Sequence, residues 1–234
     1  IGIVSSLLPS VTNLALLSIP INEAKIAFDR MFEFASTKQE LKKGEKLKEV
    51  NSITIQDAMF RFAGRKPLFS NVSIEIKKGE ILGIVGESGC GKTTLGAILQ
   101  KHYFLESGKI LINGMLDLEG IKTSSWRNRV GVVEQIPSVF NGTLIDNIVF
   151  GRQIHSEDLD SFLKKYDFDK YFIQFPGGYA TPLGEEGINI SGGQRQLMAF
   201  ARALIEMPQV LILDEATSAM DKVTEAFVLD LLEE

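Results

Sequence analysis

Cysteine, tryptophan, histidine and net positive charge are all scarce in this 234-residue sequence. The single cysteine, Cys90, excludes an internal disulfide and fits a reducing compartment. The formal net charge is −5 and the pI is near 5.3, so no global basic field is present to attract nucleic acid. Any phosphate ligand must therefore be held by local donors. The sequence also lacks internal repeats and low-complexity tracts, and its 44% hydrophobic content predicts a folded chain.

The first 22 residues contain no charged residue. Their length is close to the roughly 20 apolar residues that cross a bilayer. A buried or interfacial helix is the alternative, because polar residues and two prolines lower the hydrophobicity. A basic leader and a small-residue cleavage site are both missing, which disfavours a signal peptide. Since the chain starts at Ile1 rather than methionine, we expect it to be a piece of a longer protein.

A change of pattern at Glu23 predicts an amphipathic helix followed by a linker. Ala27, Phe28 and Met31 fall on one helical face, and charged residues fall on the other. The next stretch, "STKQELKKGEKLKEV", mixes lysine and glutamate around a glycine, which predicts a solvated linker. The chain is therefore divided into a helical segment at 1–37, a charged linker at 38–51 and a folded domain at 52–234.

Short apolar runs alternate with helical patterns throughout the third region. "EILGIVG" and "VLILD" are apolar at successive positions, as expected for strands that are buried on both faces. Strands followed by helices indicate a mostly parallel α/β sheet. We predict a strand at 80–85 and a helix that begins near Lys92.

The segment "GESGCGKTT" at 86–94 lies between that strand and that helix and matches the phosphate-loop pattern G-x-x-x-x-G-K-[ST]. Its glycines let backbone N–H groups point at phosphate oxygens, and the helix N-terminus adds a favourable dipole. Lys92 is expected to reach the β and γ phosphates, and the Thr93 hydroxyl to bind Mg²⁺. The alternative, an ordinary glycine-rich turn, is disfavoured by the flanking elements. The predicted phosphate-binding residues are Gly86, Glu87, Ser88, Gly89, Cys90, Gly91, Lys92, Thr93 and Thr94.

Two adjacent carboxylates, Asp214 and Glu215, end the strand "VLILD" and begin the next segment. Alone, such a pair is more often a solvated strand end. Together with a phosphate loop, Asp214 is predicted to contact Mg²⁺ and Glu215 to polarise the water that attacks the γ-phosphate.

The segment "GINISGGQRQLMAFARALI" predicts a capped helix. Ser191 and Gln194 have the spacing of a capping box. Gly192 and Gly193 would expose N–H groups at the helix start, which suggests a second anion site. A well-capped ordinary helix remains the alternative.

These motifs together resemble the nucleotide-binding domain of ATP-binding cassette (ABC) transporters, of the exporter type that fuses membrane and nucleotide domains. "ISGGQ" is similar to the family signature LSGGQ and lies 99 residues after Lys92 (191 − 92), which fits transporters rather than relatives with long coiled-coil insertions. The resemblance covers 52–234. It implies a P-loop NTPase (RecA-like) α/β core with an antiparallel β subdomain and a helical subdomain at about 136–190.

Further positions are assigned by this resemblance. Phe62 falls where the family stacks an aromatic ring on adenine, while Phe60 is expected in the core. Gln135 matches the glutamine that senses Mg²⁺ and the attacking water, and the segment after it resembles the contact to transmembrane coupling helices. Asp221, in "SAMD", matches a residue that crosses to a partner domain, and Glu185 matches an acidic loop position. The implied catalytic residues are Glu215, Lys92 and Gln135, the metal contacts Thr93, Gln135 and Asp214, and the further nucleotide contacts Ser191, Gly192, Gly193 and Gln194.

The resemblance also implies partners. ATP and Mg²⁺ would bind between two nucleotide-binding domains in a head-to-tail dimer, in which Ser191 and Gly193 contact the partner's nucleotide. We expect a homodimer, although a heterodimer with a degenerate partner stays open. The other expected partners are the membrane and a transmembrane domain of the same polypeptide, whose last helix would end in 1–37. Nucleic acid is not expected, and the domain would face the cytoplasm at the cell membrane.

The family has a switch histidine downstream of the "SAMD" loop, whereas the two histidines here, His102 and His155, lie upstream and are expected at the surface. We therefore expect that the sequence stops before that histidine, and that this chain alone binds Mg·ATP weakly and hydrolyses little. Cys90 lies inside the phosphate loop, so alkylation of the intact protein is expected to block ATP binding.

The leading functional hypothesis is an ATP-driven exporter subunit. The runs "FNGTLIDNI" and "FPGGYATPLGEEGINISGGQRQ" are similar to peptide or bacteriocin exporters, although multidrug and lipid exporters share much of them. A soluble cassette ATPase that acts on DNA or ribosomes is the alternative, and the uncharged N-terminus argues against it. A regulatory, non-hydrolysing module is disfavoured by Glu215 and Gln135.

Overall fold

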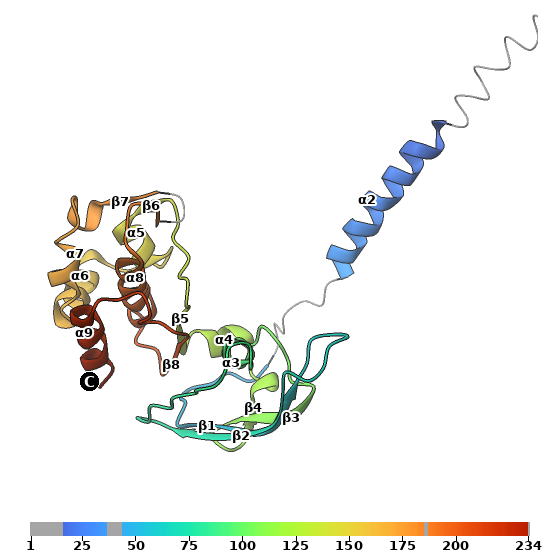
Figure 1. Ribbon diagram of the computed structural model, residues 1–234, viewed down its shortest axis with the longest axis horizontal. Coiled ribbons are helices and arrows are strands. Elements are labelled where there is room, and N and C mark those ends of the chain that lie inside the picture. The colour runs from blue at the N-terminus through green and yellow to red at the C-terminus, as the bar shows by residue number, and fades with distance from the viewer. Residues whose placement is uncertain (1–15, 37–43, 185–186, 234) are drawn as a thin grey trace, which may run out of the picture. The chain divides into compact units, whose positions relative to one another are not determined.

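A computed structural model describes residues 16–36, 44–184 and 187–233 (Figure 1). The chain divides into two compact units, residues 1–41 and 42–234. The predicted membrane-crossing stretch lies mostly outside the described residues, and so does Glu185.

The first unit contains one described helix, α2 (Ser18–Ser36), which confirms the helix expected after Glu23 and begins before it. Its large apolar side chains, including Ile26, Phe28 and Phe32, are exposed. Among the helices in the described part of the chain, none combines the length and the apolar character that crossing a bilayer requires.

The second unit begins with an antiparallel sheet of four strands. The strands are β1 (Ser52–Phe60), β2 (Phe69–Lys77), β3 (Ser107–Ile112) and β4 (Leu116–Asp117), in the order β2-β1-β3-β4 (Figure 1). Alternate side chains of β1, such as Ile53 and Ile55, point into a core that α3 (Lys92–Leu99) covers with Leu95, Ile98 and Leu99. The predicted antiparallel subdomain is thus confirmed.

A turn-rich segment closes this core. It contains η1 (Leu118–Gly120) and α4 (Thr123–Arg127), where the single tryptophan, Trp126, is fully buried and donates its indole N–H to the Leu99 carbonyl at 2.6 Å.

The second half of the expected linker packs on the same segment. Leu47 and Val50 are buried and Glu45 N–H donates to the Gly120 carbonyl, so 44–51 belongs to the folded unit rather than to a solvated tether.

A parallel pair of strands, β5 (Val130–Val133) and β8 (Val210–Leu213), joins two cores (Figure 1). Val210 and Ile212 pack with α3, whereas Leu211 packs with the second core. Neighbouring side chains therefore pack into different cores, but the strand is only partly buried and Leu213 is 38% exposed, so the predicted burial on both faces is not complete.

The predicted strand at 80–85 is wrong. Residues 80–87 have no regular secondary structure, and Ile81 and Val85 are 77% and 94% exposed. A strand requires a neighbour with which to exchange backbone hydrogen bonds. In the described chain β8 pairs with β5 alone. Residues 80–85 therefore have the apolar composition of a strand but no strand with which to pair.

The second core is formed mainly by helices. Its elements are β6 (Gly142–Thr143), α5 (Leu144–Val149), α6 (Ser156–Lys165), α7 (Phe168–Phe172), η2 (Gly178–Ala180), β7 (Pro182–Leu183), α8 (Gly192–Leu204) and α9 (Lys222–Glu233). Phe168, Phe172 and Phe200 are fully buried in it. Helix α8 lies against β5 so closely that a Cβ on Gly131 would be 2.9 Å from the Ala203 carbonyl oxygen.

Replacing Phe168 by alanine should destabilise the helical core. Phe168 is fully buried, and deletion of a buried phenylalanine side chain costs about 3–5 kcal/mol. Urea unfolding followed by far-ultraviolet circular dichroism measures the change. Ile173→Ala, at a side chain that is 74% exposed, is the control and should stay within about 0.5 kcal/mol of wild type. Equal effects of the two changes would contradict the assigned core.

Candidate functional site

The phosphate loop leads into α3, which begins at Lys92 as predicted. Gly89 and Gly91 have φ of +79° and +105°, a left-handed conformation that glycine adopts without steric cost. Gly91 is the N-cap and provides no side-chain cap, so the first N–H groups of α3 remain available to an anion. The Lys92 ammonium donates to the carbonyl oxygens of Gly86 (2.9 Å) and Glu87 (3.1 Å), which places it over its own loop.

An aromatic cluster connects Phe62 with this loop. The Phe60 ring lies 5.0 Å from Phe62 and 6.1 Å from Phe69, and a Cβ on Gly91 would be 3.0 Å from the Phe69 ring. Phe60 is buried as predicted, while Phe62 is 36% exposed. Tyr103, which the sequence reasoning missed, packs perpendicular to Phe62 with centroids 5.6 Å apart.

The register of the parallel strands brings Gln135 and Glu215 together. Val133 pairs with Leu213, so residues two positions beyond each strand meet at the same sheet edge. The Gln135 amide donates to Glu215 Oε2 at 2.6 Å. Glu215 has φ +48°, an uncommon value for a residue with a side chain.

Asp214 lies beside this pair and is half-buried. Its backbone N–H donates to the Val133 carbonyl at 3.0 Å and continues the strand pairing. Within the described ranges its carboxylate accepts no hydrogen bond, so both oxygens are available to a cation. Thr93 is exposed at the start of α3 and has a free hydroxyl there, which suits the same ion.

The helix α8 carries the predicted capping box. Gln194 N–H donates to Ser191 Oγ at 3.1 Å, and Ser191 N–H donates to Gln194 Oε1 at 2.9 Å. Both side chains are exposed. The prediction of a capped helix is therefore confirmed, and its role as a second anion site stays a prediction.

Asp221 caps α9 in this structure. Its carboxylate accepts hydrogen bonds from the N–H groups of Val223 and Thr224 and from the Thr224 hydroxyl. These bonds, chiefly the one from the Thr224 N–H, hold the pKa of the carboxyl below its usual value. The contact to a partner domain that the resemblance implies remains a prediction.

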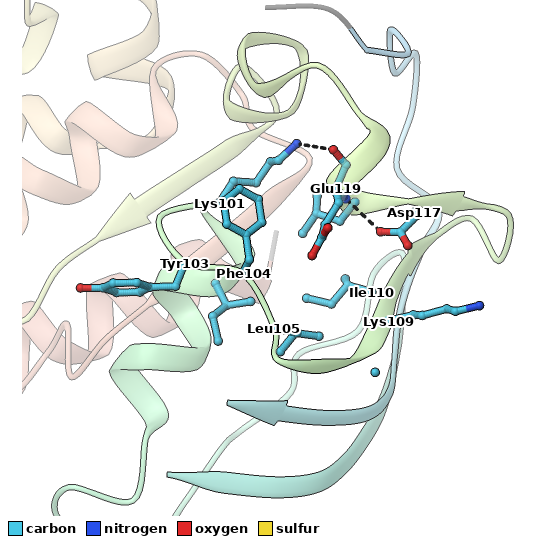
Figure 2. A pocket seen from close by; sticks show the side chains of 11 residues that line it. Lys101, Tyr103, Phe104, Leu105, Lys109, Ile110, Asp117 and Glu119 are labelled. Carbon is cyan, nitrogen blue, oxygen red and sulfur yellow. Dashed lines mark hydrogen bonds between the residues drawn. The ribbon is translucent and has the colours of Figure 1, made fainter. Parts of the chain in front are cut away.

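A small cavity of about 170 Å³ lies apart from these residues, between the end of α3 and β3–β4 (Figure 2). Lys101 is buried beside it and donates to the backbone oxygens of Ile121 (2.5 Å) and Glu119 (3.4 Å). Asp117 accepts from the Glu119 N–H at 2.9 Å, and the Tyr103 hydroxyl points away from these groups. The cavity includes none of the predicted nucleotide contacts, and Lys101 and Asp117 at its wall already bind backbone groups.

The segment after Gln135 is held by Arg202 of α8, which the sequence reasoning also missed. Its guanidinium donates to the carbonyls of Asn147 and Ser138, each at 2.7 Å, and lies over the exposed rings of Phe140 and Phe150. Burial, and secondly the charge of Arg152, lower the pKa of Arg202 to about 10. The group therefore stays charged at neutral pH.

The glycine-rich loop at an uncapped helix and the aromatic residues packed next to it suit the phosphates of a nucleotide, and the carboxylates at the parallel sheet edge suit a cation. They define the class of P-loop nucleotide-binding α/β domains.

Comparison with known proteins identifies the family within this class. A model of the ABC transporter family matches residues 69–218, and the chain belongs to this family. It is 36% identical over 190 residues to the multidrug resistance protein pgp-1 of Caenorhabditis elegans, covering 80% of this chain and 14% of that protein. It is 35% identical over 233 residues to an ATP-dependent lipid A-core flippase of Francisella tularensis, covering 98% of this chain and 38% of the flippase.

A solved structure agrees with these relatives. The structure of a bacterial Atm1-family ABC exporter with ATP bound superposes with a TM-score of 0.80 at 31% identity, over 94% of this chain and 39% of that one. The chain thus has the fold of an ABC exporter nucleotide-binding domain and spans well under half the length of the relatives it matches.

Replacing Arg202 by lysine should loosen the segment that contains Phe140 and Phe150. Lysine keeps the charge but loses the planar fork that reaches two carbonyls at once. We expect a loss of stability of about 1.5–3 kcal/mol in urea unfolding, with faster amide hydrogen exchange across 138–150. Arg65→Lys, at an exposed turn residue, is the matched control. Indistinguishable behaviour of the two variants would contradict the role of Arg202 in holding this segment.

Proposed function

We propose that this chain is the ATP-hydrolysing domain of an ABC exporter and couples nucleotide-driven closure of two such domains to export of a substrate across a membrane. The observation that carries the proposal is the hydrogen bond of 2.6 Å between Gln135 and Glu215 at the end of the β5–β8 pair. Glu215 would be the carboxylate base and Gln135 the amide that senses the attacking water, and the contact between the two side chains supports both roles.

The proposed chemistry follows from these side chains. Gln135 donates to Oε2 of Glu215 and leaves Oε1 to accept a proton from an attacking water. Lys92 exchanges its two loop carbonyls for phosphate oxygens when the nucleotide binds. Mg²⁺, held by Thr93, Asp214 and Gln135, would neutralise charge on the transferred phosphoryl group. Phe62 offers an aromatic face to the base.

The proposed partners are a second nucleotide-binding domain, a transmembrane domain and the membrane. The proteins named above include an ABC exporter and a lipid A-core flippase, which supports an export function on a membrane. Residues 1–37 would connect the domain to its membrane helices, and the segment held by Arg202 would contact them. Such contacts would place the domain on the cytoplasmic side.

Two substrate classes have specific support. The runs around 140–148 and 175–196 are similar to peptide exporters. The relatives named for multidrug resistance and for lipid A-core support an amphipathic or lipid-like substrate instead. A soluble cassette ATPase is the competing function, and solubility of the full-length protein without detergent would favour it.

Two substitutions test the proposed function in the full-length protein. Lys92→Ala should weaken Mg·ATP binding, because the cation that reaches the phosphates is removed. Glu215→Gln should retain binding but lower the hydrolysis rate by about 10²–10⁴-fold, the typical contribution of a general base. Fluorescent-nucleotide titration and phosphate release measure the two effects, and chelation of Mg²⁺ should abolish hydrolysis.

Glu75→Gln, on the exposed face of β2, is the carboxylate control and should leave both quantities unchanged. The proposal fails if the Glu215→Gln protein hydrolyses ATP at the wild-type rate or if the wild-type protein hydrolyses none.

A further inference from the structure

Gln196 of α8 is a polar residue inside an apolar core. Its side chain is only 1% exposed, and its neighbours Leu197 and Met198 belong to the helical core. A buried amide without partners is strongly disfavoured, so its hydrogen bonds indicate what it holds in place.

Within the described part of the chain, the hydrogen bonds of this side chain go to the loop that follows Asp214. The amide oxygen accepts from the Ala219 N–H at 3.0 Å. The amide nitrogen donates to the Glu215 carbonyl at 3.4 Å and to the Ser218 hydroxyl at 3.3 Å. One side chain of α8 thus binds both ends of the segment 215–219.

The segment 215–219 begins with a residue in the left-handed conformation and continues in tight turns. Glu215 adopts φ +48°, and its carbonyl also accepts the Ser218 N–H at 3.1 Å. The next turn is closed by Met220 N–H, which donates to the Thr217 carbonyl at 3.0 Å. A left-handed glutamate persists only where its surroundings enforce it. The Gln196 amide, which binds the Glu215 carbonyl, is part of that enforcement.

The two glycines at the start of α8, Gly192 and Gly193, also allow the helix to lie close to this loop. A Cβ on Gly192 would lie 3.0 Å from Ala219 Cβ, and one on Gly193 would lie 3.0 Å from the Ala219 carbonyl oxygen. The first turn of α8 and the loop therefore meet backbone to backbone. Small residues here serve packing within one chain, in addition to any role toward a ligand.

We infer that Gln196 is a positioning residue that fixes the loop carrying Glu215 to the first turns of α8, so that the "ISGGQ" segment and the general base move as one body. The kinetic part of this inference rests on the proposed ATP hydrolysis. A displacement of "ISGGQ" by a partner's nucleotide would then shift Glu215 in this chain's own site, which links the two sites through one buried amide.

The experiment compares Gln196→Met with Gln174→Met in the full-length protein. Methionine matches the shape of glutamine and removes the amide, and Gln174 is an exposed glutamine whose amide bonds only to Lys170 within its own turn. We expect Gln196→Met to speed hydrogen exchange at the Ala219 amide and to lower kcat by about 10–100-fold, as small displacements of catalytic groups do. The affinity for ATP should stay unchanged, because the phosphate loop is untouched.

Gln196→Glu keeps an acceptor for the Ala219 N–H but loses the donor to the Glu215 carbonyl, so it should restore part of the exchange protection at Ala219 while kcat stays low; it also carries the test if the methionine variant does not fold. The inference is overturned if exchange at Ala219 and kcat match the Gln174→Met control. It is also overturned if kcat and ATP affinity fall together with the thermal stability, which indicates a general structural role. A wild-type protein without hydrolysis refutes the proposed function instead, and amide exchange still decides whether Gln196 holds the loop.

Discussion

The pairing of β5 with β8 is the constraint on which the rest of the second unit depends. Its register, Val133 opposite Leu213, decides which residues meet at the sheet edge, and a slip of one position would separate Gln135 from Glu215. The same pair joins the two hydrophobic cores, because Ile212 packs toward α3 and Leu211 toward the helices. Packing of neighbouring β8 residues into two different cores therefore helps to fix the geometry of the carboxylate site.

Helix α8 contacts the rest of the second unit at three points that keep this geometry in place. Its first residues form a capping box and touch the loop at Ala219, Gln196 binds that loop from within the core, and Arg202 holds the segment after Gln135 at its far end. The hydrogen bonds of Gln196, and the one from Arg202 to the Asn147 carbonyl, are partly buried and each has a defined partner, so the helix cannot slide without breaking several bonds at once. Rigidity of this kind suits a helix that connects a predicted ligand contact with a predicted membrane contact.

Local sequence rules succeeded where the chemistry is local. The helix start at Lys92, the capping box of Ser191 and Gln194, and the strand that ends before Asp214 were all predictable, since each depends on a few neighbouring residues. The strand at 80–85 failed because strand formation also needs a neighbouring strand, which composition does not supply. Leu47 and Val50 were assigned to a solvated linker because the surrounding lysines outweighed two apolar residues. Gln196, Arg202 and Tyr103 gave no signal, because their roles appear only when segments up to 64 residues apart are packed together.

The two glycine-rich motifs offer different surfaces to a ligand despite their similar composition. At α3 the N-cap is a glycine without a side-chain cap, and the N–H groups of the first turn have no side-chain acceptor in the described structure. At α8 the N-terminal donors are partly satisfied by the Ser191–Gln194 box. Only the Gly192 and Gly193 N–H groups and the Ser191 hydroxyl proton are left to an incoming anion, on a backbone already packed against Ala219. The proposed roles follow this difference: the first motif would surround a phosphate, whereas the second would approach a phosphate held elsewhere and transmit that approach to Glu215 through the loop on which it packs.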